Sequence, residues 1–183
     1  MLTDRAPEQI ETPRLVLSRP IEHDLQEIFD RYASDQEVVT YLSFPRHRTI
    51  ADTEFFLSIS NREWSECPSG PYLIRSKADG ALLGGTGLSF ETRWRAMTGY
   101  VLARNSWGLG YATEALEAMV TLARQLDVIR LYALCHPAHR ASQRVLVKGG
   151  FTEEAMLRRY SVFPNLDPAE PVDTLCYTLI TTD

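Results

Sequence analysis

The sequence predicts a mixed α/β fold in a single domain over residues 1–183, and three observations lead to this prediction. The 183 residues are 44% hydrophobic and 23% charged, a composition that supplies one core of ordinary size. Antiparallel hairpin signals come early in the chain, and a strand–helix–strand unit follows later. A Gly-x-Gly element follows a strand meander and not the first strand, which argues against a doubly wound nucleotide fold.

The first half of the chain is predicted to run strand, helix, helix and then three strands. Alternating apolar residues distinguish the strands, and apolar residues at a spacing of three or four distinguish the helices. An Asp79-Gly80 turn predicts that two of the strands form a hairpin. In order, the predicted elements are residues 12–20, 21–34, 50–64, 72–76, 81–90 and 97–104.

The second half is predicted to alternate helices with strands. The most regular helical pattern covers residues 111–126, where Ala115, Leu116 and Met119 are among the recurring apolar side chains. Gly149-Gly150 closes a shorter helix, as glycines commonly do. The remaining elements are a strand at 128–135, a helix within 138–151, strands at 151–163 and 173–180, and a proline-rich loop at 164–171.

Charge and cysteine usage exclude several classes of protein. With 19 basic and 24 acidic residues the net charge is −5, which is unlike a general nucleic-acid surface. No apolar run approaches the roughly 18 residues of a membrane span, and the polar, acidic first residues do not resemble a signal peptide. Cys67, Cys135 and Cys176 are odd in number and far apart, which favours reduced thiols over disulfides or zinc. We therefore expect a cytoplasmic protein without a metal.

The stretch "NSWGLGYATEAL", residues 105–116, places Gly108 and Gly110 directly before the predicted helix. Backbone amides at a helix start have no intrahelical partner, and the helix dipole adds positive charge there. Two residues without side chains let a ligand approach those amides closely. The pattern predicts either an anion-binding cradle or a plain turn.

Two well-known phosphate-binding motifs do not match this stretch of sequence. A Walker A loop needs a lysine after its last glycine, and none follows here. A dinucleotide fingerprint needs a third glycine where this chain has Thr113. A cradle of amides without lysine suits phosphates that are held and not transferred, as in coenzyme A, and disfavours a kinase or small ATPase.

The same stretch resembles the acyl-CoA-binding motif Q/R-x-x-G-x-G/A of the GNAT superfamily of N-acetyltransferases. Trp107 stands at the Q/R position, Gly110 at the glycine and Ala112 at the final position. The tryptophan resembles the branch of bacterial ribosomal-protein N-terminal acetyltransferases, where W-G-x-G-Y-A-T-E-A recurs. The segments "ETPRLVLSRP" and "CHPAHRASQRVLVKGGF" also resemble that branch, and the matches run from Thr12 to Phe151.

The resemblance implies a fold and a cosubstrate. The fold is a mostly antiparallel sheet of about six to seven strands, splayed at the fourth and fifth strands and flanked by about four helices. The cosubstrate is acetyl-CoA, with its pantetheine arm beside the fourth strand and its pyrophosphate on the amides of the glycine turn. The cofactor-binding residues that it implies are Val101, Leu102, Gly108, Leu109, Gly110, Tyr111, Ala112, Thr113, His139 and Ser142.

Acetyl transfer to an amine requires a proton acceptor, a polarised carbonyl and a stabilised leaving thiolate. The resemblance implies direct attack, so Cys135 is expected to be an ordinary buried residue. It points to Glu91 as the proton acceptor, with a solvated turn glutamate as the alternative. Leu146 occupies the position of the usual thiolate-protonating tyrosine, so Ser142 is the candidate acid, with a helix-cap or CoA contact as the alternative.

The predicted function is therefore an acetyl-CoA-dependent N-acetyltransferase that acts on a primary amine of a protein N-terminus or a small molecule. A catalytically impaired CoA-binding protein is the alternative, because Leu146 replaces the tyrosine and His139 stands where the branch has asparagine. A monomer and a homodimer are both open. Residues 29–64 and 163–171 are expected to choose the acceptor, but they follow no recognisable code.

Overall fold

The computed structural model describes residues 5–182, and side chains in that range except those of residues 167–169. The described residues form an eight-stranded mixed sheet with the order β1-β2-β3-β4-β5-β6-β8-β7. All neighbouring strands are antiparallel except β5 and β6. The strands are β1 (Gln9–Glu11), β2 (Leu15–Ser18), β3 (Pro71–Ser76), β4 (Leu82–Thr92), β5 (Arg95–Leu102), β6 (Arg130–Cys135), β7 (Thr152–Phe163) and β8 (Asp167–Ile180).

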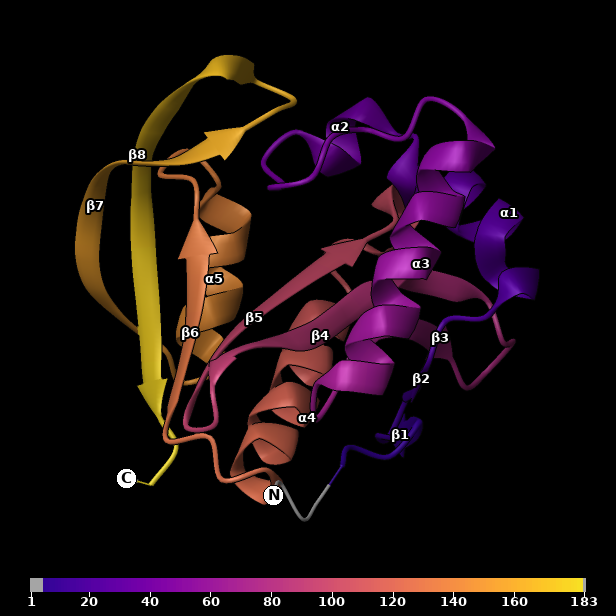
Figure 1. Cartoon of the computed structure of the whole chain (residues 1–183), viewed down its shortest axis with the longest axis horizontal. Helices are drawn as coiled ribbons and strands as arrows, with labels where there is room; N and C mark the ends of the chain where they lie inside the picture. The colour runs from indigo at the N-terminus through magenta and orange to yellow at the C-terminus, as the bar shows by residue number, and fades with distance from the viewer. Residues whose placement is uncertain (1–4, 183) are drawn as a thin grey trace.

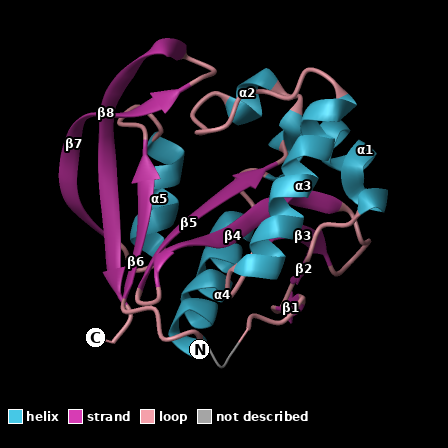
Figure 2. Cartoon of the chain, in the orientation of Figure 1, coloured by secondary structure: helices cyan, strands magenta, loops and turns pink. Residues whose placement is uncertain are grey.

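Helices cover both faces of this sheet, so the predicted mixed α/β class is confirmed (Figures 1 and 2). α1 and α3 lie on one face, and α4 and α5 lie on the other. The alternation of β3 reflects the two layers, because Leu73 and Ile74 belong to different hydrophobic clusters. The α-helices are α1 (Leu25–Ile28), α2 (Gln36–Val39), α3 (Ile50–Glu66), α4 (Tyr111–Gln125) and α5 (Arg140–Lys148).

Several elements differ from the sequence prediction. The sheet has one strand more than predicted, because β1 is too short for alternation to be recognised. The helix expected over residues 21–34 is irregular: a 3₁₀ turn, α1 and the π-helical segment Phe29–Ala33 follow one another. The short helix α2 was not predicted, and its N-cap is Asp35, whose carboxylate accepts a hydrogen bond from the amide of Glu37 at 2.9 Å.

The proline-rich loop predicted at residues 164–171 is wrong in extent. The chain turns over residues 164–166, and β8 already begins at Asp167. β6 pairs with β8 only from Leu175 onward, so the first half of β8 has β7 as its neighbour and a free opposite edge. A free edge tolerates Pro171, which lacks the N–H of other residues.

The sheet opens between β5 and β6, which are the fourth and fifth strands of the prediction. Only Arg95–Met97 of β5 pairs with β6, while β5 stays paired with β4 as far as Leu102. The strands therefore diverge after Met97 and leave one backbone edge of β5 without a strand partner in the described part of the chain (Figure 1). The predicted splay is confirmed.

The main core lies between the sheet and α4. Leu116, Met119 and Leu122 of α4 are almost completely buried, as the three-and-four spacing predicted. This packing fixes the start of α4 against the ends of the central strands. In residues 5–182, no helix has the length and apolar character that a membrane crossing requires.

Candidate functional site

The glycine turn forms an open cradle at the start of α4. Gly108 and Gly110 have φ angles of +75° and +82°, a left-handed conformation that glycine adopts without steric cost. Among the described residues no side chain caps the helix, so the amides of Tyr111, Ala112 and Thr113 have neither a capping nor an intrahelical partner. The geometry leaves these amides accessible to an anion, and anion binding here stays a prediction.

A cation that the sequence pattern did not reveal lies beside this cradle. Arg14 donates a hydrogen bond from Nη1 to the carbonyl of Leu109 at 2.9 Å, and its guanidinium lies 4.7 Å from the ring centroid of Tyr111. A Cβ added to Gly110 would be 3.3 Å from Nη2 of the same arginine. The cradle is therefore not made of amides alone. Arg14 is 95 residues from Leu109 in sequence, so no local motif could indicate the contact.

Glu114 holds Arg14 in place. Its carboxylate accepts hydrogen bonds from Nε of Arg14 at 2.7 Å and from Oγ1 of Thr12 at 2.5 Å. Partial burial opposes ionisation, but these hydrogen bonds outweigh it and keep the pKa of Glu114 below its usual range. Glu114 is therefore an ionised brace in the first turn of α4, where the helix dipole favours a negative charge.

Trp107 connects the cradle to the sheet. Its indole Nε1 donates a hydrogen bond to the carbonyl of Leu102 at 2.8 Å, although 44% of the residue is exposed. This bond fixes the loop between β5 and α4 at the end of the splayed strand. It also means that the carbonyl of Leu102, one of the predicted pantetheine contacts, already has a protein donor.

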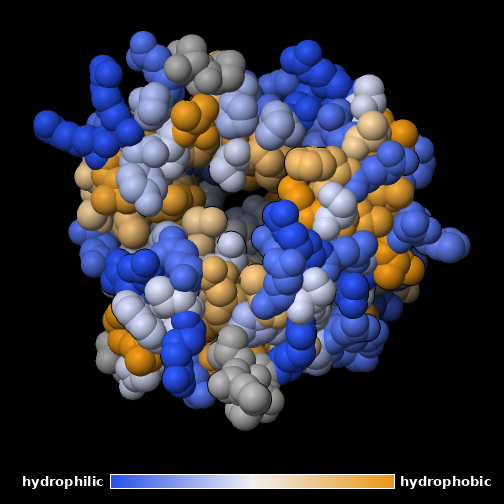
Figure 3. Space-filling view, in the orientation of Figure 1, coloured by the Kyte–Doolittle hydropathy of each residue, from blue (hydrophilic) through white to orange (hydrophobic). Residues whose placement is uncertain are grey.

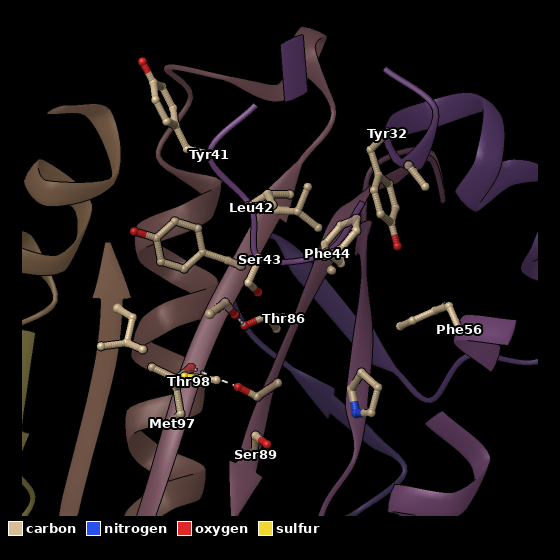
Figure 4. A pocket seen from close by; sticks show the side chains of 18 of the residues that line it. Tyr32, Tyr41, Leu42, Ser43, Phe44, Phe56, Thr86, Ser89, Met97 and Thr98 are labelled. Atoms are coloured by element: carbon tan, nitrogen blue, oxygen red, sulfur yellow. Dashed lines mark hydrogen bonds between the residues drawn. The ribbon is translucent and has the colours of Figure 1, made fainter. Parts of the chain in front are cut away.

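A cavity of about 680 Å³ lies between α3 and the floor made by β4 and β5, and it continues into the opening between β5 and β6. We call it the chamber. Residues 41–47 form its roof, and its inner end reaches α5. Figure 3 shows the opening as a hollow bordered in part by hydrophobic residues, and Figure 4 shows the side chains inside. The chamber is lined by residues from both regions that were expected to choose the acceptor.

The roof is held by residues from the other end of the chain. The side chain of Asn165, in the turn between β7 and β8, donates to the carbonyls of Val39 at 2.7 Å and Phe44 at 2.9 Å. Its oxygen accepts a hydrogen bond from the amide of Arg46 at 2.8 Å. Tyr41 in the roof stacks on the His139 ring, with centroids 4.9 Å apart.

Two hydroxyl groups meet at the inner end of the chamber. Oγ of Ser142 on α5 lies 2.9 Å from the hydroxyl of Tyr100 on β5, and both residues line the chamber. Burial raises the pKa of Tyr100 far above its usual value, so the phenol keeps its proton at neutral pH. Tyr100 was not singled out from the sequence. The one sequence signal was that Leu146, which is buried, occupies the position of the usual thiolate-protonating tyrosine, so a hydroxyl from another residue was required.

His139 also lines the chamber, at the N-terminal end of α5. Burial is the main cause that lowers the pKa of His139, and the neighbouring His136 adds to the effect. The imidazole is therefore neutral at pH 7. Within the described residues no hydrogen bond reaches its ring nitrogens, which remain available to a ligand or water.

Glu91 is not brought together with these residues. It lies near the end of β4, outside the lining of the chamber, and its side chain is 41% exposed. One carboxylate oxygen is 2.6 Å from Nε of Arg95, and the other accepts a hydrogen bond from the hydroxyl of Tyr132. These contacts resemble the alternative interpretation of Glu91 as a surface residue, and its catalytic role remains a prediction.

The predicted site residues therefore fall into three groups. The cradle consists of Gly108, Leu109, Gly110, Tyr111, Ala112 and Thr113. The chamber is lined by Val101, His139 and Ser142. Two predicted residues, Leu102 and Glu91, lie outside the lining of the chamber. Cys135 is buried at the end of β6, and burial raises the pKa of its thiol, so it is a poor nucleophile. Over residues 5–182 no three His, Cys, Asp or Glu side chains are grouped to hold a metal ion.

A mixed sheet splayed between β5 and β6, with a glycine turn at the start of the helix α4 that connects them, is the architecture that the resemblance to N-acetyltransferases implied. A family model described as an acetyltransferase (GNAT) domain matches residues 14–152. The chain belongs to the GNAT acetyltransferase family, and it is an acetyl-CoA-dependent acetyltransferase.

Similar proteins agree with this assignment. An uncharacterised N-acetyltransferase, p20 of Bacillus licheniformis, is 28% identical over 156 residues, which cover 84% of this chain and 87% of that protein. The solved structure of RimL, a ribosomal L7/L12 α-N-protein acetyltransferase in complex with coenzyme A, has a TM-score of 0.83 at 20% identity and covers 94% of this chain and 98% of that one. The microcin C7 self-immunity acetyltransferase MccE, in complex with acetyl-CoA and AMP, has a TM-score of 0.83 at 18% identity and covers 96% and 97%. At these identities the two structures show the fold.

Proposed function

We propose that this chain transfers the acetyl group of acetyl-CoA to a primary amine by direct attack. The observation that carries the proposal is the pair of neutral hydroxyls, Tyr100 and Ser142, at the point where the chamber meets the opening between β5 and β6. A thiolate leaving group needs a proton donor there. The family assignment and the CoA-bound relatives MccE and RimL support the proposal.

The residues present fit acetyl-CoA. The free amides of Tyr111 to Thr113 and the guanidinium of Arg14 would hold the pyrophosphate, because both favour negative charge in one place. The free edge of β5 around Val101 would pair with the amide groups of the pantetheine arm. Bound acetyl-CoA would supply an activated acyl group as a thioester.

We propose Ser142 as the proton donor and Tyr100 as its partner. Ser142 Oγ holds a proton at the inner end of the chamber, and Tyr100, 2.9 Å away, supplies or receives a proton along the same hydrogen bond. This keeps the role predicted for Ser142, and Tyr100 supplies a tyrosine hydroxyl that position 146, a leucine in this chain, does not offer. General acid catalysis of this kind contributes about 10² to 10⁴ in rate.

We propose His139 as the proton acceptor for the amine, in preference to Glu91. A neutral imidazole with unbonded ring nitrogens inside the chamber is competent to take a proton directly or through water. The carboxylate of Glu91 is occupied by Arg95 and Tyr132 outside the lining. The predicted contact between His139 and CoA is compatible with this role.

The test is an acceptor screen with purified protein and acetyl-CoA, read out by CoA release and by the mass of the acetylated product. We expect turnover with at least one primary amine, and we expect Ser142→Ala to reduce it. Tight acetyl-CoA binding without any product would favour the alternative of a catalytically impaired CoA-binding protein. A protein N-terminus or a small molecule as acceptor, a cytoplasmic location, the absence of a nucleic-acid partner, and a monomer or homodimer stay predictions.

A further inference from the structure

We infer that the acceptor carries its primary amine on a neutral apolar group, either a flat aromatic ring or a branched aliphatic chain. This inference rests on the proposed function and names the substrate class of the same site. It follows from the walls, the floor and the charges of the chamber, which are taken in turn below.

The walls of the chamber are aromatic and aliphatic. Figure 4 shows Tyr32, Phe44 and Phe56 around the space above β4 and β5. Tyr72 and Ile59 add further apolar surface from β3 and α3. Transfer of an apolar group from water to such a surface is favourable, and flat rings gain additional contact with aromatic neighbours.

The floor of the chamber is flat because two glycines face each other across β4 and β5. Gly87 pairs with Gly99, so no side chain rises from either position. A Cβ added to Gly99 would meet no atom within 4 Å, which means that the space above this position is open. Over Gly87 a Cβ would be 3.0 Å from the Cα of Pro71, so the open part of the floor lies at Gly99, where a planar group can lie directly against the peptide backbone.

The carbonyl groups of this floor already have hydrogen-bond donors. Thr86 Oγ1 donates to the carbonyl of Gly99 at 2.8 Å, and Thr98 Oγ1 donates to the carbonyl of Gly87 at 2.9 Å (dashed in Figure 4). A ligand that covers the floor therefore does not need to donate hydrogen bonds to these carbonyls. An apolar group covers it without leaving these carbonyls unsatisfied.

The charged groups of the lining do not favour a polycation. The carboxylate of Asp52 accepts hydrogen bonds from the amides of Arg48 and Thr49 at 2.8 and 2.9 Å. Glu63 has no hydrogen-bond or ion-pair partner among the described residues, but partial burial raises its pKa and so opposes its charged form. Arg46 lies exposed in the roof and repels positive charge. The lining therefore offers a polycation two carboxylates, one of them already hydrogen-bonded to backbone amides, and opposes it with Arg46, which suits polyamines and aminoglycosides less well than an apolar amine.

The required chemistry is found both in free arylalkylamines and in peptides that begin with phenylalanine or leucine. A matched panel separates these sources: phenethylamine, isoamylamine, ethanolamine, spermidine and kanamycin, together with peptides that differ only in a first residue of Phe, Leu, Ser or Gly. We expect kcat/KM for phenethylamine and isoamylamine to be about tenfold or more above that for ethanolamine, because apolar pockets discriminate by this amount. We expect the same ratio for the Phe and Leu peptides over the Ser and Gly peptides.

Three variants test whether the chamber is the source of this selectivity. Gly99→Leu fills the open space above the floor and should reduce kcat/KM for phenethylamine at least tenfold, and Gly99→Ala should have a smaller effect in the same direction. Phe56→Ala removes part of a wall and should reduce the preference for apolar acceptors without abolishing turnover. Ile129→Ala is the control, because Ile129 is exposed and lies outside the chamber.

The outcomes separate the inference from the proposed function. Acetyl-CoA binding should stay within about threefold of the parent in all four variants, because the cradle is unchanged. If spermidine, kanamycin or the serine peptide is the best acceptor, or if Gly99→Leu leaves the selectivity unchanged, the inference is wrong while the transferase function stands. If no amine yields acetylated product, the proposed function itself fails.

Discussion

The cradle and the chamber are built in opposite ways. The cradle uses six consecutive residues, 108–113, braced by one ion pair between Arg14 and Glu114. The chamber collects side chains from α3, the roof, β4, β5, β6, α5 and β7. The half of the site that would hold the common cosubstrate is thus mostly local in sequence, with Arg14 as its distant member. The half that would hold the variable acceptor depends on the packing of distant segments and can change without disturbing the first.

Gly110→Glu is expected to have the largest effect, because it should disrupt acetyl-CoA binding at the cradle and leave the chamber intact. A residue with a side chain is strained at a φ of +82°, and a carboxylate here repels the pyrophosphate. We expect acetyl-CoA binding, measured by calorimetry, to weaken at least about 100-fold while circular dichroism shows a folded protein. Gly110→Ala is the matched control, because it introduces the strain without the charge. Binding of Gly110→Glu near the parent affinity would mean that the turn holds no anion.

Removal of the hydroxyl of Tyr100 or Ser142 should affect catalysis in the chamber and leave acetyl-CoA binding at the cradle unchanged. Tyr100→Phe and Ser142→Ala should each lower kcat about 10- to 100-fold, because each removes part of one proton pathway. The double variant should be little worse than the slower single variant, since residues that act as a unit are not additive. Steady-state kinetics and acetyl-CoA titration of the four proteins test this. Fully multiplicative losses would show that the two hydroxyls act separately.

His139→Gln should lower kcat/KM about tenfold and change its pH dependence. Because burial lowers the pKa of His139 from 6.5, the neutral base persists as the pH falls to 6.5, and activity is lost only at lower pH as the imidazole is protonated. The acid limb of the pH profile should therefore lie below pH 6.5 in the parent and disappear in the variant. If the acid limb of the pH profile is unchanged in His139→Gln, another group causes that limb. The pH profile of Glu91→Gln tests the earlier prediction that Glu91 is the proton acceptor.

The glycine turn before a helix could be predicted because its residues are adjacent in sequence and the helix follows a regular period. The splayed sheet and the role of Ser142 were instead implied by the resemblance to a known family, and the role of Ser142 stays a prediction. The sequence missed Arg14 beside the cradle and Tyr100 beside Ser142, because contacts between distant elements have no local signature. The resemblance also pointed to Glu91, near the end of a predicted strand, as the proton acceptor. Only the fold shows that this carboxylate is engaged by Arg95.

Arg14→Ala tests the brace of the cradle and should have a moderate effect. Loss of the guanidinium removes its contacts with Leu109, Tyr111 and Glu114, so acetyl-CoA binding should weaken about three- to tenfold, consistent with the value of charge-assisted hydrogen bonds. Arg14→Lys keeps the charge and should recover part of the loss. Affinities measured at low and high salt distinguish charge from packing, and no change in Arg14→Ala would remove this residue from the site.

Trp107→Phe should have the smallest effect. It keeps an aromatic ring but removes the hydrogen bond to the carbonyl of Leu102, a contribution of about 1 kcal/mol in a typical case. We expect a small decrease in thermal stability and acetyl-CoA binding that is about two- to threefold weaker, with kcat unchanged. A large loss of kcat would instead connect Trp107 to the chamber.

The central claim is that cradle and chamber together perform acetyl transfer to an amine. Its most direct test is single-turnover reaction of the parent and Ser142→Ala proteins with acetyl-CoA and the best amine of the screen, followed by mass spectrometry of the product. The account predicts one acetylated amine per CoA released in the parent, a slower reaction in Ser142→Ala and equal acetyl-CoA affinity in both. Product formation at the same rate in both proteins, or tight binding without product in the parent, would contradict it.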